Sequence, residues 1–348
     1  MAQVSPFRYL ISPLVGSALV LLVCLPLPIF AADVVLLKNS KPGLPPVQRQ
    51  GEIVDLLGNQ LSFRGPTGAV ESFPLEQVTE WRTTWGQNKT QGDALLAEKK
   101  FAEAAAAFLR AREEESRTWA RRQIMERVIE SQTAAGNIVA AAEEFFALVA
   151  SDPDTPAWEI VPLAWRTSDD PNLPAHAAQW LRDARNPVKQ LLGASWLLIG
   201  AQRAEAVTTL QALSSGPNKR IATLAVIQLW RTRVVASEPG EPAQWLAGLE
   251  RLPPEVRPLG YFIVGEGLTR HNQPEQAALA YLRIPILYPR QRALAAEALL
   301  AAGTQLEKMG RREQAVSLYR EVLTDHATQP AAAAARLRWE QLSAPMKP

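Results

Sequence analysis

Residues 303–322 read GTQLEKMGRREQAVSLYREV, and the spacing of a few small and aromatic residues within them decides the fold. A glycine is followed by a leucine, an alanine and an aromatic residue in the pattern G-x2-L-x8-A-x3-[FY]. The pattern occurs three times without a gap, at Gly92, Leu95, Ala104 and Phe108, at Gly265, Leu268, Ala277 and Tyr281, and at Gly303, Leu306, Ala315 and Tyr319. A pattern that recurs at this many positions predicts a repeated structural unit.

Each unit fits two helices joined by a short turn. The residues around the pattern are rich in strong helix formers, and Gly310 permits the turn between the two helices. Antiparallel helices pack about 8–10 Å apart, so only small residues such as Gly303 and Ala315 fit at the closest approach. Tyr319 lies on the same helix face as Ala315. We expect its ring to fill the wider space toward the neighbouring unit.

The pattern resembles the tetratricopeptide repeat (TPR) over residues 88–153 and 258–343. A further segment keeps only the second half of the motif, at Gly136, Ile138, Ala141, Phe145, Leu148 and Pro153. The resemblance implies a right-handed solenoid of helical hairpins, in which the first helix of each pair lines a concave surface. From Gly265 to Gly303 the step is longer than the roughly 34 residues of one repeat, which predicts longer helices or an added turn near Pro285.

Residues 154–257 lack the TPR pattern but remain helical in composition. Asn186-Pro187 precedes an Ala194-Ser195-Trp196 helix, and Asn218-Lys219 precedes Leu224-Ala225 in the same way. This arrangement is similar to the second helix of a HEAT repeat. We expect degenerate, HEAT-like helical pairs here that continue the stack, because each unit of a solenoid contacts only its neighbours.

Residues 33–85 precede the helical region and differ from it. They contain about five short apolar stretches separated by turns such as Gly58-Asn59 and Gly65–Gly68. Alternation at Leu61 and Phe63 predicts half-buried strands. The segment is similar to small SH3-like or Sm-like barrels, which bind peptides or RNA in some families. We favour a module for interaction or packing.

Residues 1–32 have the features of a secretory signal peptide. Arg8 is the only charged residue before Asp33, the stretch Leu14–Cys24 is apolar, and small residues precede Asp33. We expect cleavage after Ala32 or one residue earlier, and export to the periplasm or the extracellular space. An uncleaved membrane anchor and a lipid on Cys24 are the alternatives. Residues 344–348 form a short tail.

The sequence offers no recognisable catalytic or metal-binding chemistry. The chain has 37 Lys and Arg against 35 Asp and Glu, so no nucleic-acid partner is expected. None of the three histidines, His176, His271 and His326, has a partner at a metal-ligand spacing. No phosphate-binding loop or hydrolase motif is present. We therefore expect a protein that is not an enzyme and binds neither metal nor cofactor.

These observations favour a binding scaffold of the cell envelope that presents its concave surface to a protein or peptide partner. The TPR register places ten residues on that surface: Asp93, Leu96, Phe262, Glu266, Thr269, Arg270, Leu300, Thr304, Glu307 and Lys308. Two alternatives remain at this point. One is a protein that binds or processes envelope polymers such as peptidoglycan, which as an enzyme would need convergent carboxylates. The other is a structural protein that self-assembles through its open ends.

Overall fold

The structure is a computed structural model that describes residues 33–41 and 43–343. The predicted signal peptide (1–32) and tail (344–348) lie outside the described residues. The described part is mainly helical and begins with a small antiparallel sheet, as predicted. The strands are β1 (Asp33–Leu37), β2 (Val47–Leu57), β3 (Gln60–Arg64), β4 (Val70–Pro74) and β5 (Val78–Arg82), in the sheet order β4-β3-β2-β1-β5.

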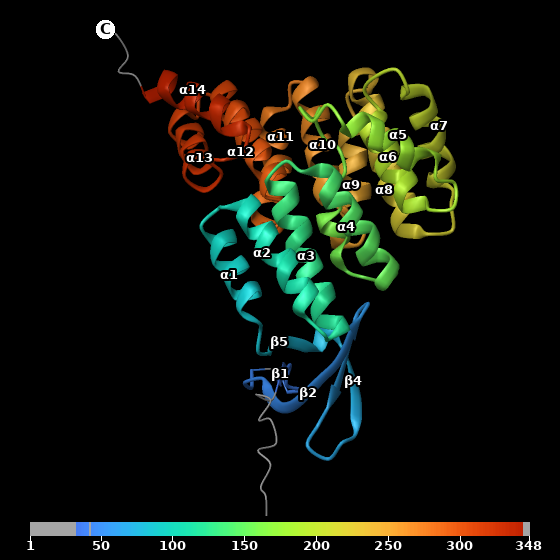
Figure 1. Cartoon of the computed structure of the whole chain (residues 1–348). Coiled ribbons are helices and arrows are strands. Elements are labelled where there is room, and N and C mark those ends of the chain that lie inside the picture. The colour runs from blue at the N-terminus through green and yellow to red at the C-terminus, as the bar shows by residue number, and fades with distance from the viewer. Residues whose placement is uncertain (1–32, 42, 344–348) are drawn as a thin grey trace, which may run out of the picture.

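The helices follow the sheet in the chain and form the rest of the described molecule (Figure 1). They are α1 (Gln87–Ala97), α2 (Phe101–Glu114), α3 (Thr118–Ala134), α4 (Ile138–Ser151), α5 (Leu173–Arg182), α6 (Pro187–Leu197), α7 (Arg203–Ser214), α8 (Lys219–Arg233), α9 (Glu241–Leu249), α10 (Pro258–Arg270), α11 (Pro274–Leu287), α12 (Arg292–Lys308), α13 (Arg312–Asp325) and α14 (Ala331–Ser343). The described chain also has four short 3-10 helices: η1 (Leu75–Gln77) lies between β4 and β5, and η2 (Ala157–Ile160), η3 (Val234–Ala236) and η4 (Pro254–Val256) lie between α-helices. Most consecutive helices pack against each other.

The sheet and α3 share one core. Trp119 of α3 is buried among the apolar side chains of the sheet, such as Leu61 and Phe63. Arg122 of α3 donates a hydrogen bond to the backbone oxygen of Leu56 at 2.8 Å and pairs with Asp55. A sheet this small buries little apolar surface by itself, so α3 completes its core and holds it against the helices.

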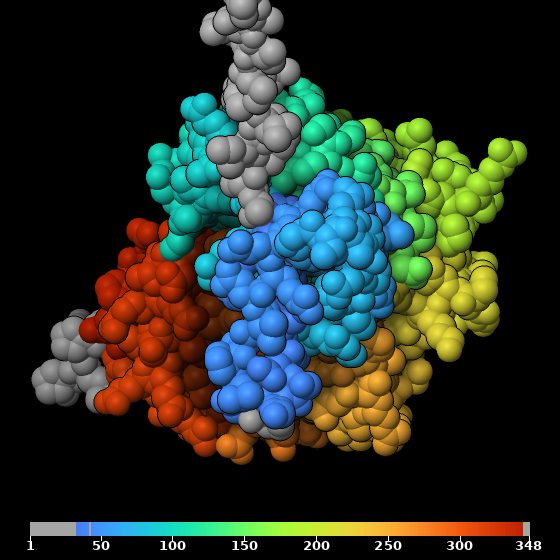
Figure 2. Space-filling model, turned by 90° about the horizontal axis from the view of Figure 1, so that it is seen from below, coloured from blue at the N-terminus to red at the C-terminus, as the bar shows by residue number. Residues whose placement is uncertain are grey.

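The chain closes on itself, because the C-terminal helices return to the N-terminal ones. Figure 2 shows the helices following one another around the sheet, which is blue and central in this view, with α12–α14 beside α1 and α2. Arg290, just before α12, bonds Glu126 of α3 at 2.7 Å and Glu159 of η2 at 3.1 Å, and also pairs with Glu130. Lys99 adds a bond of 2.5 Å to the backbone oxygen of Thr324.

The three predicted glycines lie at the closest approach of two helices, and each faces an aromatic ring. A Cβ added at Gly92 would lie 2.6 Å from the ring of Phe108, and one at Gly303 would lie 2.5 Å from the ring of Tyr319. Gly265 faces Tyr281 in the same way. The aromatic ring therefore packs on the glycine of its own pair. The missing side chain of the glycine leaves room for this flat ring. Phe108 also belongs to one core cluster with Ile124 of α3, and Tyr319 to one with Ala331 of α14. Packing toward the neighbouring unit therefore stays a prediction.

The longer repeat step comes from a longer helix. Helix α12 has 17 residues and α10 has 13. The difference is about one helical turn and lies before Gly303. Of the two predicted explanations, longer helices are confirmed.

Candidate functional site

The ten predicted concave-surface residues are scattered rather than joined in one open groove. Leu96 and Phe262 are buried, Arg270 and Lys308 are exposed, and the other six are partly buried. Asp93 pairs with Lys89 of its own helix at 2.6 Å. Of the ten, only Glu266 lines the hollow of about 510 Å³ that opens beside Trp165.

Four of the ten face the aromatic residue of their own repeat. One is Thr304, whose hydroxyl is 3.4 Å from the Tyr319 hydroxyl. The other three each lie four residues after the glycine of their repeat. The Thr269 hydroxyl is 3.4 Å from the Tyr281 hydroxyl, and Glu307 accepts a hydrogen bond from the Tyr319 hydroxyl. Leu96 is the equivalent residue opposite Phe108, which has no hydroxyl. These side chains serve packing within the repeat. This contact could have been predicted from the sequence, because the residue four positions after the glycine is polar only where the aromatic residue of the repeat is tyrosine.

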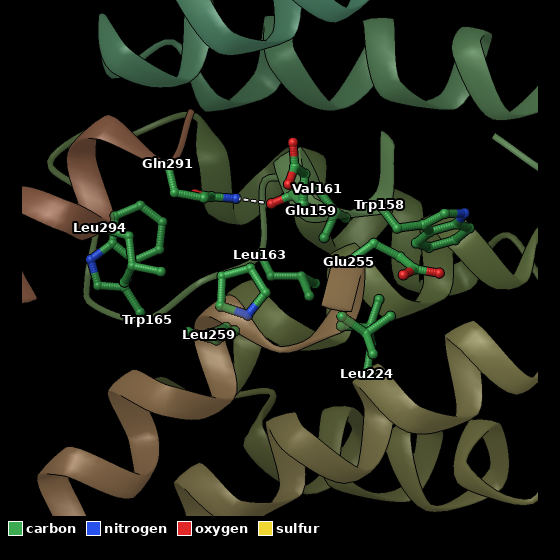
Figure 3. A pocket seen from close by; sticks show the side chains of 12 residues that line it. Trp158, Glu159, Val161, Leu163, Trp165, Leu224, Glu255, Leu259, Gln291 and Leu294 are labelled. Carbon is green, nitrogen blue, oxygen red and sulfur yellow. Dashed lines mark hydrogen bonds between the residues drawn. The ribbon is translucent and has the colours of Figure 1, made fainter. Parts of the chain in front are cut away.

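Part of the inner face is covered by the chain itself. Helices α6, α8, α10 and α12 contact one another in series and form an inner layer. The segment 157–166, between α4 and α5, lies against this layer and leaves a void of only about 20 Å³ between them (Figure 3). The void has room for little more than one water molecule. An extended partner peptide therefore finds this part of the inner face already occupied.

Polar contacts fix segment 157–166 in place. The backbone nitrogen of Ala164 donates to the Ser195 hydroxyl at 2.7 Å, and the Trp196 indole donates to the backbone oxygen of Pro162 at 2.9 Å. Gln228 of α8 also reaches the backbone oxygen of Ala164, at 3.4 Å. Ser195 and Gln228 are buried, so these bonds satisfy backbone groups that have lost water.

A hollow of about 510 Å³ opens beside Trp165 of this segment. Its walls are formed mainly by apolar residues of the α6–α7 connection and of η3: Leu198, Ile199, Val234 and Val235. Ile199 and Val235 have exposed fractions of 59% and 69%. The volume falls in the range of about 300–1,000 Å³ that is typical of small-molecule sites. The hollow is the best candidate for a ligand site in the described part of the chain.

Two opposite charges also line the hollow without forming an ion pair. They are Glu266 of α10 and Arg231 of α8. Burial raises the pKa of Glu266 to about 7, and the charge of Arg231 offsets this only in part. Burial lowers the pKa of Arg231 to about 10, against the opposing effect of Glu266. Each group has thus lost water without gaining full compensation from the other.

The hydrogen bonds around these two charges leave donors and acceptors open. Nη1 of Arg231 donates to the backbone oxygen of Ser195 at 3.0 Å and to Oε1 of Gln228 at 2.7 Å. Among the described residues, no acceptor bonds its Nε or Nη2, and no donor bonds Glu266. Arg203, which also lines the hollow, makes no ion pair with any residue that the structure describes. Sequence reasoning placed Glu266 on the inner face but missed both arginines.

Within residues 33–41 and 43–343, no group of three or more His, Cys, Asp and Glu side chains is arranged to hold a metal ion. In the same residues, no helix is long and apolar enough to cross a membrane.

The chain matches no protein-family model, and no curated protein matches it significantly. The resemblance to the TPR family therefore stays a prediction that rests on the repeat pattern.

Proposed function

We propose that the chain is a non-enzymatic, exported scaffold of the cell envelope that binds a protein partner. In this proposal its helices form a right-handed solenoid of TPR-like pairs, HEAT-like in the middle, and its sheet is an SH3-like module docked on α3. The glycine–aromatic contacts at Gly92, Gly265 and Gly303 support the TPR-like pairs. The pairing of β1 with both β2 and β5 supports the module.

The observation that carries the proposal is an apolar stripe on α11. Leu279, Ile286 and Leu287 are exposed by 58%, 72% and 54%. The residues stand seven and eight positions apart, so they share one face of the helix. Large apolar residues gathered on one exposed face mark a contact surface.

A groove of about 400 Å³ runs beside this stripe, between α11 and α13. Leu282, Leu306, Met309 and Leu318 line it. Arg311 and Glu275 also line the groove and pair with each other at 3.3 Å. An apolar groove of this kind suits the apolar face of a partner helix. The proposed contact surface thus lies on second helices of the pairs, away from the inner layer that segment 157–166 covers.

The proposal is tested by crosslinking from the native envelope, with the crosslinked peptides mapped by mass spectrometry. We expect crosslinks of one partner to α11 and α13, and loss of that partner with Leu279→Asp. Leu337→Asp on α14 is the matched control, because Leu337 is 61% exposed but lies away from the groove.

The double variant Arg270→Glu with Lys308→Glu tests the concave surface predicted from the TPR register, to which both residues were assigned, instead of the surface on α11. Both side chains are exposed, so the variant is expected to fold. Loss of the partner with the double variant, together with its retention by Leu279→Asp, would refute docking on α11. Crosslinks between two copies of this chain, with a molecular mass by light scattering that rises with concentration, would instead identify self-assembly.

A further inference from the structure

The hollow beside Trp165 has a chemistry that a protein-binding groove does not require. Glu266 and Arg231 line one cavity, each has hydrogen-bonding positions that no described residue fills, and the two do not pair. Desolvated charges are retained in proteins where they are paired or bind something. Apolar side chains surround both charges.

We propose that this hollow binds a free apolar α-amino acid in its zwitterionic form, a function that goes beyond the scaffold role. The α-ammonium group donates to the carboxylate of Glu266. The α-carboxylate accepts from Nε and Nη2 of Arg231. The apolar side chain packs against Trp165 and Leu198, and Val235 and Ile199 close over it.

Charge complementarity distinguishes this ligand from simpler ones. A fatty acid or an N-acylated amino acid satisfies Arg231 but leaves Glu266 without a donor. An amine or an amino-acid amide satisfies Glu266 and leaves Arg231 without an acceptor. A ligand that carries both charges, as the zwitterion of an α-amino acid does, completes both groups. The interior of a peptide chain carries neither charge.

Arg203 reinforces the choice of a carboxylate at one end of the ligand. It lies on the α6–α7 side of the hollow, has no ion pair among the described residues, and is exposed to solvent. An exposed arginine attracts an anion over a distance of about one Debye length. We therefore place the ligand's carboxylate toward the two arginines.

The test is isothermal titration calorimetry of the full chain with four probes: L-leucine, N-acetyl-L-leucine, L-leucinamide and octanoate. We expect L-leucine to bind, and each of the other three to bind about tenfold more weakly or worse, since each loses one charge-assisted contact. Glu266→Gln should weaken L-leucine by a similar factor while leaving N-acetyl-L-leucine unchanged. Arg203→Gln should also weaken the binding of L-leucine, because it removes positive charge beside the ligand's carboxylate. Arg182→Gln is its matched control and should leave binding unchanged, because Arg182 is an exposed arginine of α5 outside the hollow.

Several outcomes would overturn the inference. N-acetyl-L-leucine or octanoate binding as tightly as L-leucine would show a carboxylate site without a role for Glu266. L-leucinamide binding as tightly would show a cation site. No heat with any probe, while circular dichroism and the thermal midpoint show a folded chain, would leave the hollow without an amino-acid ligand. None of these results touches the scaffold proposal, which depends on α11 and on a protein partner.

Discussion

The outer repeats and the middle of the helical region both bring helices into close contact at a glycine, but they do so in opposite ways. In the pair α12–α13, Gly303 is on the first helix and receives the ring of Tyr319. In the pair α5–α6, Gly193 is on the second helix, and an added Cβ would lie 2.5 Å from the backbone oxygen of Ala177. In the first arrangement a side chain packs on the glycine, and in the second the backbones of the two helices pack directly on each other.

The difference concerns the interior of each pair. A ring inserted between two helices fills that interior in the TPR-like pairs, whereas in α5–α6 the two backbones meet directly. Open space lies between the pairs in both regions: hollows of about 510 and 340 Å³ lie beside α8 and α7, and the groove of about 400 Å³ lies between α11 and α13. The segment that departs from the repeat pattern is thus the one in which unpaired charges and open space occur together.

The largest expected effect comes from removing a ring from an outer pair. Phe108 is fully buried against Gly92, so Phe108→Ala should destabilise the chain by about 3–5 kcal/mol. Leu213→Ala should cost less than about 2 kcal/mol, because Leu213 is only partly buried and borders a hollow of the middle region. Urea denaturation measures both. Equal losses would mean that outer and middle pairs are packed alike.

The next effect concerns Glu266 and depends on pH. Its pKa in the folded chain is raised to about 7 from 4.5, so the folded state binds more protons than the unfolded state between these values. Stability must therefore fall as pH rises from about 4.5 to 7, by up to about 3 kcal/mol. Glu266→Gln removes this cost and should stabilise the chain at pH 8 while changing little at pH 4.

The control for Glu266→Gln is Glu313→Gln on α13, which makes the same change of charge at an exposed position. Thermal unfolding of both variants at pH 4, 6 and 8 gives the comparison. If Glu266→Gln is no more stabilising at pH 8 than Glu313→Gln, the carboxyl group is not desolvated as the structure indicates.

Part of this architecture was predictable because it depends on neighbours in the chain. The mainly helical fold and the small sheet follow from local pattern, and the glycines of the three repeats were placed correctly at close contacts. Arg290 and Glu130, by contrast, are 160 residues apart. Nothing in either local sequence indicates that they meet, so the closure of the chain was not foreseen.

The hollow was hidden for the same reason. Trp165, Arg231 and Glu266 come from three distant segments with no common period. The repeat register gave Glu266 a place on the inner face, but the register assumed an open surface. Segment 157–166 covers part of that surface and has no repeat pattern, so its position could not be predicted from the sequence.

A smaller effect separates the two kinds of glycine contact. Gly193→Ala forces the backbones of α5 and α6 apart and should cost about 2–3 kcal/mol, even though alanine favours the helix. Gly303→Ala meets a side chain, and a small shift of the Tyr319 ring lowers the cost to about 1 kcal/mol. Chemical denaturation of both variants gives the two losses in the free energy of unfolding. A larger loss for Gly303→Ala would show that the ring is held as rigidly as the backbone.

The smallest effect tests whether the tyrosine hydroxyls contribute to the outer pairs beyond the packing of their rings. The Tyr319 hydroxyl donates to the carboxylate of Glu307, so Tyr319→Phe removes a hydrogen bond to a charged group and should cost about 1.5 kcal/mol. The Tyr281 hydroxyl meets only the neutral Thr269 hydroxyl at 3.4 Å, so Tyr281→Phe should cost about 0.5 kcal/mol or less.

Glu307 has a second partner, Arg338 at 3.8 Å, which keeps its charge compensated in Tyr319→Phe. The loss should therefore stay below that of Gly193→Ala. Adding Glu307→Leu to Tyr319→Phe recreates the combination of Leu96 and Phe108 found in the first repeat. We expect the double variant to regain most of the lost stability in urea denaturation, because an apolar pair no longer buries an unmatched polar group. A further loss in the double variant would mean that Glu307 serves Arg338 and α14 more than it serves the repeat.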